Sequence, residues 1–301
     1  MVKKTIMRIL VTGCTGLIGS SVYKCLLKKK ADVYGLCYSR TTDSNENVFK
    51  VDLASEEESI IGISQISPDI IIHTAAVLPS SHNSEESSIV ASKNHLIDKH
   101  IIDYCQKHST RLVYTSSAYI YNREETLSSL TESSTIHPEG SYLQQKYESE
   151  KRIKTSLKDY LILRVSSPFG AELKKGVIKV FIDKALNNDH ITLYGNGERV
   201  QDFISVQDVA LIIEELVFKN VNGIYNLSSG EPISMKQLAL WVIELTESKS
   251  KLIFDESKVD LCLNNNFSNK KLLSDIDGSL KYNVRDGIVD IILKNENRSS
   301  L

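Results

Sequence analysis

The sequence predicts an α/β protein with a doubly wound parallel sheet and a smaller, mixed α/β domain at its C-terminal end. Three observations support this prediction. Short apolar runs alternate with amphipathic helical segments through the first half of the chain. A glycine-rich turn joins the first apolar run to the first helical segment. The chain has 301 residues, a length typical of two domains. Strands separated by helices pair in parallel through right-handed crossovers, which gives the doubly wound arrangement.

The elements of the first half follow from their apolar patterns. Short apolar runs predict strands at 9–11, 33–38, 70–72, 112–114 and 161–163. Apolar residues at helical spacing predict helices at 19–29, 56–66, 93–108 and 142–157. The alternation ends near residue 165. We therefore expect one domain over 1–165, joined by part of 200–228, and a second domain over 166–301.

The second half is less regular. Helical spacing predicts helices at 177–186, 209–218 and 234–245. Polar stretches predict loops at 41–47, 79–92, 122–141 and 264–270, and residues 295–301 resemble a frayed tail. The loop at 122–141 is long enough to suggest a function beyond simple connection.

Composition excludes several classes of protein. Hydrophobic residues make up 41% and charged residues 25%, which is an ordinary globular mixture. The formal charge of −2 gives no electrostatic footprint for nucleic acid or an anionic membrane. Scattered cysteines and histidines show no ligand spacing, so we expect no metal and a reduced, cytoplasmic environment. No stretch approaches the roughly 20 apolar residues that cross a bilayer.

The strongest local signal is the glycine turn. Gly13-Cys14-Thr15-Gly16-Leu17-Ile18-Gly19 follows an apolar run and opens a helix. Glycines let the backbone approach a pyrophosphate at a helix N-terminus, where free N–H groups and the helix dipole favour anions. A tight turn without a ligand is the alternative. At the first strand-to-helix turn, this spacing favours a dinucleotide site.

The end of the second predicted strand bears on which dinucleotide binds. An acidic residue there binds the adenosine ribose of NAD. This strand instead ends in Tyr38-Ser39-Arg40, without an acid. Arginine pairs with a 2′-phosphate, so the sequence favours NADP(H), with NAD(H) as the alternative. A solvated loop arginine is the other interpretation of Arg40.

Tyr142 and Lys146 stand one helical turn apart, so they share one helix face. A free phenol is a weak acid at neutral pH, and a nearby ammonium favours its ionised form. Ser117, at the end of a neighbouring strand, can share a substrate oxygen with the phenol. The spacing alone is weak, because Tyr147 and Lys151 repeat it on another side of the helix.

Together these residues resemble the extended short-chain dehydrogenase/reductases, in the nucleotide-sugar epimerase/dehydratase family. The resemblance covers nearly the whole chain and selects Tyr142 over Tyr147. It rests on Thr12–Gly19, Asp52-Leu53, Pro68-Asp69, His73–Ala76, Thr115–Tyr121, Tyr142–Lys146 with Glu150, Leu163–Gly170, Gly195–Ile204 with Val206 and Asp208, and Gly223–Leu227.

The resemblance implies a Rossmann domain for the cofactor and a second domain that closes over the sugar. The implied catalytic residues are Ser117, Tyr142 and Lys146. The implied cofactor residues are Gly13, Thr15, Gly16, Leu17, Ile18, Ser39, Arg40, Asp52, Leu53, Thr74, Ala75, Ala76, Tyr142 and Lys146. The implied substrate residues are Ser117, Ala118, Tyr119, Ser167, Arg199 and Gln201.

Departures from the family pattern narrow the reaction. The 4,6-dehydratases carry an Asp-Glu pair where this chain has Ala118 and Tyr119, so dehydration is disfavoured. The epimerising cysteine of GDP-fucose synthases would also fall at Tyr119, so epimerisation at C3 and C5 is disfavoured. Gln201 stands where arginine is usual, with Arg199 nearby to replace it. Ser167 stands where asparagine is common.

We therefore expect NADPH-dependent reduction at C4 of a nucleotide-diphosphate-linked 4-keto(-6-deoxy) sugar, such as a dTDP-sugar, for surface polysaccharide. Tyr142 would protonate the carbonyl oxygen and Ser117 would polarise it. An NAD-dependent C4 epimerase would use the same residues. A non-catalytic NADP-binding sensor or scaffold is a further alternative, although it would not need Ser117, Tyr142 and Lys146. The resemblance also implies a homodimer formed through helices 93–108 and 142–157.

Overall fold

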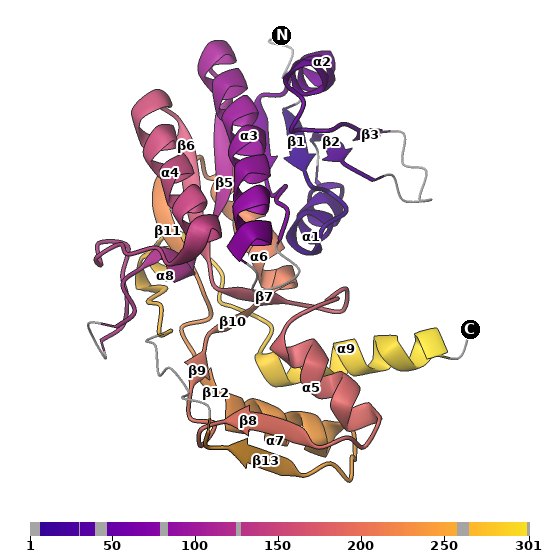
Figure 1. Ribbon diagram of the computed structural model, residues 1–301. Coiled ribbons are helices and arrows are strands. Elements are labelled where there is room, and N and C mark those ends of the chain that lie inside the picture. Colours follow the sequence, from indigo (N-terminus) through magenta and orange to yellow (C-terminus); the bar gives the residue numbers. More distant parts are fainter. Residues whose placement is uncertain are drawn as a thin grey trace. The chain divides into compact units, whose positions relative to one another are not determined.

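A computed structural model describes residues 7–29, 31–39, 47–78, 84–124, 128–257 and 265–299 (Figure 1). The chain divides into two compact units. Unit 1 comprises Met1–Tyr121, Thr135–Val165 and Ala210–Tyr225. Unit 2 comprises Asn122–Ser134, Ser166–Val209 and Asn226–Leu301.

Unit 1 is built on a central sheet. Within the described ranges, seven strands form this sheet in the order β11-β6-β5-β4-β1-β2-β3. The pairs from β6 across to β3 are parallel. The predicted doubly wound parallel sheet is therefore confirmed. Its strands are β1 (Arg8–Thr12), β2 (Asp32–Cys37), β3 (Val48–Lys50), β4 (Ile70–His73), β5 (Arg111–Ser117), β6 (Tyr160–Val165) and β11 (Gly223–Leu227).

The order of the strands places a switch point at β1. Strand β1 pairs with β2 on one side and with β4 on the other, with Ile9 opposite both Val33 and Ile70. The chain therefore winds away from β1 in both directions. In such sheets, ligands bind outside the carboxyl ends of the strands at this point. Gly13 follows β1 there, and Thr74 follows β4.

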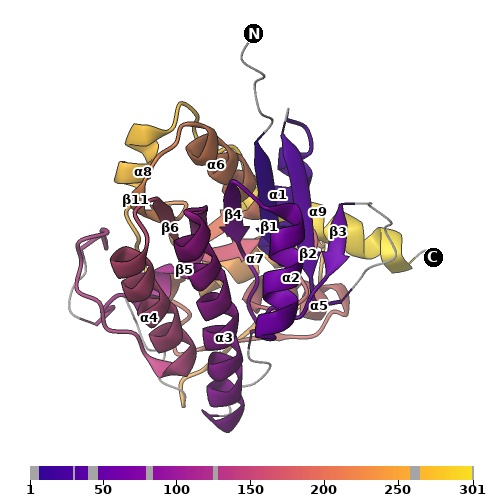
Figure 2. The same ribbon diagram turned by 90° about the horizontal axis from the view of Figure 1, so that it is seen from above.

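Helices cover the sheet of unit 1 (Figure 2). Apolar side chains of α2, α3 and α4 pack on one face, with Ile63, Ile101 and Ile153 fully buried. Helices α1 and α6 contact each other where the thiol of Cys25 donates to the carboxylate of Glu214 at 3.1 Å. The helical elements are α1 (Leu17–Leu26), α2 (Glu56–Ile66), α3 (Ser84–His108), α4 (Gly140–Ser156), α6 (Val206–Phe218) and the 3₁₀ turn η1 (Ala118–Ile120).

Several predicted boundaries were wrong. Helix α3 begins at Ser84, so residues 84–92 are helical and not part of a loop. Glu85 and Glu86 suit the N-terminus of a helix, although a run of polar residues resembles a loop. The edge strand β3 was not predicted, because three residues are too few to show the alternation of a strand. Residues 295–299 continue helix α9 instead of fraying, and α8 begins at Lys270, inside a predicted loop.

Unit 2 is a mixed α/β unit, as predicted. Its short strands pair as β7 with β10, β9 with β12 and β8 with β13. Apolar faces of α5, α7 and α9 form its core, with Ile182, Leu238 and Ile288 fully buried. Its elements are β7 (Ser167–Phe169), α5 (Val177–Leu186), β8 (Ile191–Tyr194), β9 (Val200–Gln201), β10 (Phe203–Ser205), β12 (Ile233–Ser234), α7 (Met235–Leu245), β13 (Leu252–Asp255), α8 (Lys270–Asp275) and α9 (Val284–Ser299).

No helix in the described part of the chain is both long enough and apolar enough to span a membrane.

Candidate active site

A cavity of about 380 Å³ lies in unit 1 at the carboxyl ends of the central strands. The glycine turn, the end of β2, the residues after β3 and β4, and helix α3 all contribute to its wall. Nine residues predicted to bind the cofactor line this cavity: Gly13, Thr15, Gly16, Ser39, Asp52, Leu53, Thr74, Ala75 and Ala76.

The glycine turn fits close against the loop after β4. Gly13 has a φ of +67°, and a Cβ there would lie 2.7 Å from Cα of Ala75. A Cβ at Gly19 would lie 2.2 Å from the carbonyl oxygen of Gly13. No side chain caps the first turn of α1, which begins at Leu17 and includes Ile18. Its free N–H groups are those that hold a pyrophosphate, so this turn fits a dinucleotide.

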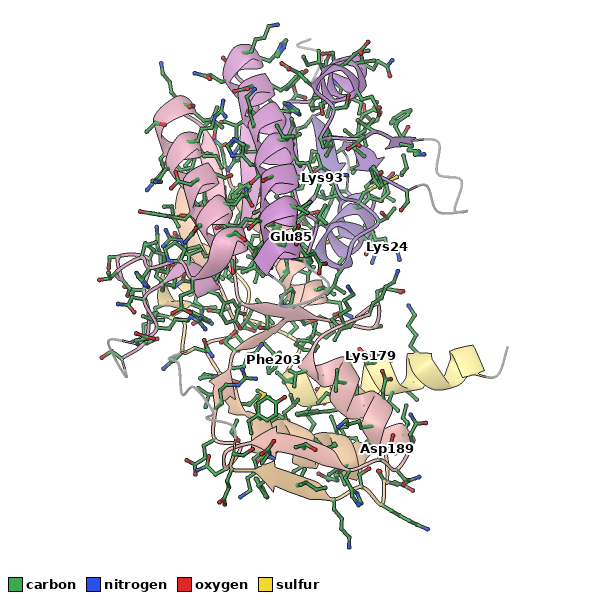
Figure 3. All side chains as sticks on the ribbon, viewed as in Figure 1. Lys24, Glu85, Lys93, Lys179, Asp189 and Phe203 are labelled. Atoms are coloured by element: carbon green, nitrogen blue, oxygen red, sulfur yellow. The ribbon has the colours of Figure 1, made fainter. Side chains whose placement is uncertain are left out.

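The end of the cavity beside β2 carries a positive charge. Lys93 of α3 (Figure 3) places its ammonium 4.5 Å from the centre of the Tyr38 ring. The lining residues include one carboxylate, Asp52, which accepts a hydrogen bond from the N–H of Ala54 at 3.0 Å. Arg40 lies outside the described residues.

Lys93 and Tyr38 were not among the site residues predicted from the sequence. A signal was nevertheless present. Lys93 stands one helical turn before Ile97, an apolar residue of the buried stripe that also lines the cavity. A cation on the inner face of a helix is informative, because such a face is ordinarily apolar.

Helix α4 carries Tyr142 and Lys146 one turn apart, as predicted. The Nζ of Lys146 donates to the carbonyl oxygen of Thr115 at 3.1 Å and lies 4.6 Å from the centre of the Tyr114 ring. Ser117 ends β5, and its Oγ accepts a hydrogen bond from the N–H of Tyr119 at 3.2 Å. The lysine therefore reaches β5 two residues before the serine.

The competing pair on α4 has a different environment. The side chain of Lys151 is 46% exposed, and its ammonium lies 5.2 Å from the centre of the Tyr147 ring. Lys146 is only 3% exposed. A solvated ammonium is screened by water, whereas a buried one acts strongly on its neighbours. This contrast favours Tyr142 and Lys146 as the functional pair.

A buried hydrogen-bond network, which was not predicted from the sequence, surrounds Lys146. Asp98 of α3 is 1% exposed. Its Oδ1 lies 2.9 Å from Nε2 of His73. Its Oδ2 accepts hydrogen bonds from the Tyr114 hydroxyl at 2.5 Å and from Nε2 of Gln145 at 2.7 Å. The other ring nitrogen of His73 lies 2.6 Å from Oγ1 of Thr12, the residue before the glycine turn.

The network has a definite electrostatic character. Burial opposes the charge of Asp98, but the Lys146 ammonium and the hydrogen bonds from His73 and Tyr114 hold the pKa of Asp98 well below its usual range. Burial and the adjacent Asp98 raise the pKa of Tyr114 well above its ordinary value. Asp98 is therefore an ionised carboxylate, and Tyr114 keeps its proton.

The predicted substrate residues fall into two groups. Ser117, Ala118 and Tyr119 lie in unit 1, at the end of β5 and in η1. The other three lie in unit 2, where Nε2 of Gln201 donates to Oγ of Ser167 at 2.5 Å. Arg199 precedes β9, and its carbonyl oxygen accepts a hydrogen bond from the N–H of Met235 at 2.9 Å.

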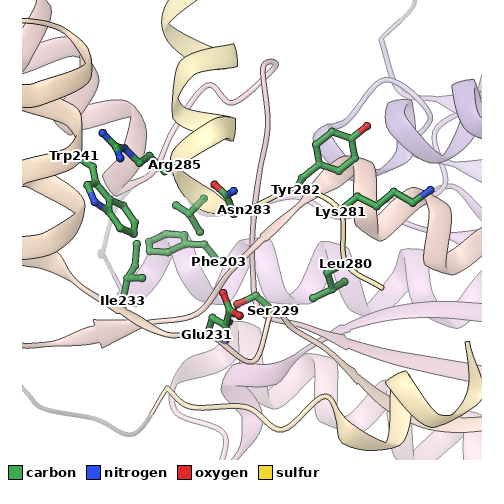
Figure 4. A pocket seen from close by; sticks show the side chains of 11 residues that line it. Phe203, Ser229, Glu231, Ile233, Trp241, Leu280, Lys281, Tyr282, Asn283 and Arg285 are labelled. Atoms are coloured by element: carbon green, nitrogen blue, oxygen red, sulfur yellow. Dashed lines mark hydrogen bonds between the residues drawn. The ribbon is translucent and has the colours of Figure 1, made fainter. Parts of the chain in front are cut away.

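Unit 2 also contains a cavity of about 470 Å³ (Figure 4). Trp241, Ile233 and Phe203 group at one end of it, and Lys281 and Tyr282 lie at the other. The residues that line this cavity include none of the predicted substrate residues. Across the described residues of both units, no three histidine, cysteine, aspartate or glutamate side chains form a group that could hold a metal ion.

Comparison with known proteins adds a family to this geometry. The family model described as "NAD dependent epimerase/dehydratase family" matches residues 9–228. That span includes the glycine turn, Ser117, Tyr142, Lys146 and Gln201.

Individual relatives cover almost the whole chain. A protein of Methanocaldococcus jannaschii named "Putative UDP-glucose 4-epimerase" is 26% identical over 97% of this chain and 100% of its own length. The dTDP-4-dehydro-6-deoxyglucose reductase of Escherichia coli is 24% identical over 81% of this chain and 83% of its own. The structure of a UDP-glucose 4-epimerase from Thermus thermophilus, in complex with NAD, superposes with a TM-score of 0.83 at 24% identity, over 98% of this chain and 100% of that one.

Proposed function

The chain belongs to the NAD dependent epimerase/dehydratase family, and from this premise we propose that it reduces the C4 keto group of a nucleotide-linked 4-keto-6-deoxy sugar with NADPH. The observation that supports this proposal most is the composition of the unit 1 cavity at its end beside β2. Tyr38 and Ser39 stand there without an acid, and Lys93 lies over the Tyr38 ring. A cation at this end suits a ribose that carries a 2′-phosphate.

The residues of the chain would act on the sugar oxygen. A bound nicotinamide dinucleotide supplies the hydride. Tyr142 donates a proton to the C4 oxygen, and Ser117 donates a hydrogen bond to the same atom. Lys146 favours the loss of that proton from the phenol and binds the nicotinamide ribose. Burial of Lys146 supports this role, because its charge is not screened by water.

The missing carboxylates support reduction over dehydration. Ala118 and Tyr119 follow Ser117 directly, in the 3₁₀ turn η1. Neither side chain provides a carboxylate for removing a proton from a sugar carbon or protonating a leaving hydroxyl. Simple reduction and C4 epimerisation need neither group.

A C4 epimerase that retains NAD is the second candidate. The similarity to the Methanocaldococcus jannaschii relative over 97% of the chain favours it. The same three residues would first remove a proton from the C4 hydroxyl and later return it. The two candidates therefore differ in cofactor use, since only the reductase consumes NADPH. A non-catalytic sensor would have no use for the three residues.

One experiment separates these candidates. The purified protein is mixed with NADPH and dTDP-4-keto-6-deoxyglucose, and in parallel with UDP-glucose and NAD. We expect NADPH absorbance to fall in proportion to the 4-keto sugar consumed, with no UDP-galactose formed. Conversion of UDP-glucose without net cofactor use would identify the epimerase instead. Absence of both reactions across a panel of nucleotide sugars would favour the sensor.

We further propose that the protein acts in the cytoplasm as a homodimer formed through α3 and α4. These two helices pack together, and Ile89 and Leu96 of α3 are 65% and 43% exposed. Exposed apolar side chains on paired helices favour association with a second copy. Light scattering on the purified protein would give twice the chain mass; a monomer at all concentrations would refute this proposal.

A further inference from the structure

Lys146 is a buried cation. Its side chain is 3% exposed, and its ammonium donates to the backbone carbonyl of Thr115. A carbonyl carries no net charge to compensate an ammonium. Removal of a lysine from water favours the neutral amine unless an opposite charge lies nearby. The proposed role of Lys146 requires the ammonium, so the source of compensation matters.

Asp98 and this ammonium both contact Tyr114. The hydroxyl of Tyr114 donates to Oδ2 of Asp98, while the face of the same ring lies 4.6 Å from Nζ of Lys146. The ring thus joins a negative group at its edge to a positive group on its face. The neighbouring Gln145, next to Lys146 on α4, also donates to Oδ2 of Asp98.

The hydrogen bonds alone do not account for an ionised group at this position. A buried carboxylate is costly unless it is paired, and a neutral amide of the same shape could occupy the site. An asparagine oxygen could accept the bonds from Tyr114 and Gln145, and its amide could donate to Nε2 of His73. What an amide cannot provide is negative charge.

Among the groups that face Asp98, Lys146 is the principal cation. His73 comes from β4, Tyr114 from β5, and Gln145 and Lys146 from α4. Tyr114 and Gln145 are uncharged donors. His73 makes contacts at both ring nitrogens, with Asp98 at Nε2 and with Thr12 at the other. Tyr142 faces the same region through its interaction with Tyr114.

We propose that Asp98 is the counter-charge that keeps Lys146 in its ammonium form, which makes Asp98 a positioning residue of the active site. It touches neither sugar nor cofactor and acts through Lys146. The low pKa of Asp98 is consistent with this pairing, because the Lys146 ammonium is the largest of the influences that lower it.

The charge of Lys146 can be measured without any substrate. Protein with ¹³C at the lysine ε-carbons is titrated by NMR, and the Lys146 signal is assigned by its absence in Lys146→Met. In Asp98→Asn we expect this signal to titrate about 1 pH unit or more below its wild-type midpoint. An unchanged midpoint would overturn the proposal.

Asp103→Asn is the matched control. Asp103 lies on the same helix and pairs with Lys99 and Arg152, but its side chain is 39% exposed. Its removal takes the same charge from α3 and should leave the Lys146 midpoint within a few tenths of a unit. An equal shift in both variants would contradict a specific role for Asp98.

Two further variants separate charge from packing. Tyr114→Phe keeps the carboxylate and the ring but removes the hydroxyl bond, and it should leave the midpoint near the wild-type value. Asp98→Thr is a second neutral variant, should Asp98→Asn fail to fold; it should shift the midpoint as Asp98→Asn does. A full shift in Tyr114→Phe, or none in Asp98→Thr, would refute the counter-charge.

The catalytic consequence rests on the proposed function. With dTDP-4-keto-6-deoxyglucose and NADPH, the alkaline limb of the kcat/KM profile should move to lower pH in Asp98→Asn, with kcat retained at the acidic end. If the alkaline limb stays in place while the NMR midpoint moves, turnover does not depend on the charge of Lys146. If the wild type reduces no sugar, the proposed reaction fails and the NMR arm still decides the charge.

Discussion

The amide of Gln201 donates a hydrogen bond to the hydroxyl of Ser167, with 2.5 Å between Nε2 and Oγ. Both residues were predicted to contact the nucleotide sugar, and both depart from the residue type that is usual in the family. The strands that carry them, β9 and β7, belong to unit 2. From this contact we expect the two residues to act together on one ligand.

Truncation of either partner should therefore weaken nucleotide binding, and the two effects should not add. We expect Gln201→Ala and Ser167→Ala each to raise the Kd for dTDP about 5-fold. In the double variant, the Kd should rise by less than the product of these two factors. Calorimetric titration with dTDP measures all three. Full additivity would mean that the hydrogen bond does not couple the residues, and unchanged affinities would remove both from the substrate site.

Lys93 should discriminate between the two nicotinamide dinucleotides. We expect Lys93→Met to weaken NADPH binding roughly 10-fold while NADH binding stays nearly constant, because a charged hydrogen bond to the 2′-phosphate is lost. Fluorescence titration of both reduced cofactors measures this ratio. Lys99→Met is the control, since Lys99 lies on the same helix but pairs with Asp103. Equal losses for both cofactors would contradict a phosphate contact.

Much of this site could be predicted from local sequence patterns. The glycine turn is contiguous, so it appears without knowledge of the fold. Helical spacing predicts both Tyr142 with Lys146 and Tyr147 with Lys151, and the resemblance to the family selects the first pair. The sheet follows from the alternation of apolar runs and helices. Gly13 and Ser39 each follow a strand of the parallel sheet, and the carboxyl ends of such strands lie at one edge.

Other residues could not be found in this way. Lys93 lies over Tyr38, and Asp98 bonds to His73 and Tyr114, only because α3 packs across the ends of β2, β4 and β5. Each contact joins segments far apart in the sequence, and an isolated lysine or aspartate in a helix resembles a solvated charge. The start of α3 was misplaced for a related reason, since its first turns are polar and its packing is tertiary.

The ion pair between Glu150 and Arg164 should stabilise unit 1. Both side chains are almost fully buried, 2.7 Å apart, and Arg164 also donates to the Tyr121 hydroxyl at 2.8 Å. Glu150→Gln leaves a buried guanidinium without its partner, so we expect the free energy of unfolding to fall by about 3–5 kcal/mol. Urea unfolding measures this change.

The control for that experiment lies on the same helix. Glu148 pairs with Lys151 at the surface, with side chains 60% and 46% exposed. Glu148→Gln should change the free energy of unfolding by less than about 1 kcal/mol. Similar losses of unfolding free energy in the two variants would mean that the buried pair stabilises the fold no more than the exposed pair does.

Asp98 should make stability depend on pH in the acidic range. Its pKa in the folded protein lies below the unfolded value of roughly 4. The charged form therefore stabilises the fold above that pH, and the stabilisation is lost as the pH falls through the folded pKa. Asp98→Asn lacks this titration. The difference in unfolding free energy between wild type and Asp98→Asn should shrink below about pH 4. A difference that stays constant down to that range would contradict an ionised Asp98.

We propose that Tyr142 gives a proton to a sugar oxygen while the sugar carbon is reduced. The most direct measurement follows deuterium from nicotinamide-deuterated NADPH into C4 of dTDP-4-keto-6-deoxyglucose by NMR, in the wild type, Tyr142→Phe and Tyr147→Phe. We expect deuterium transfer in the wild type and in Tyr147→Phe. In Tyr142→Phe we expect the transfer rate to fall by a factor of roughly 100 or more, with NADPH binding intact. Equal rates in the wild type and Tyr142→Phe, or no deuterium at C4 in any of the three proteins, would contradict the account.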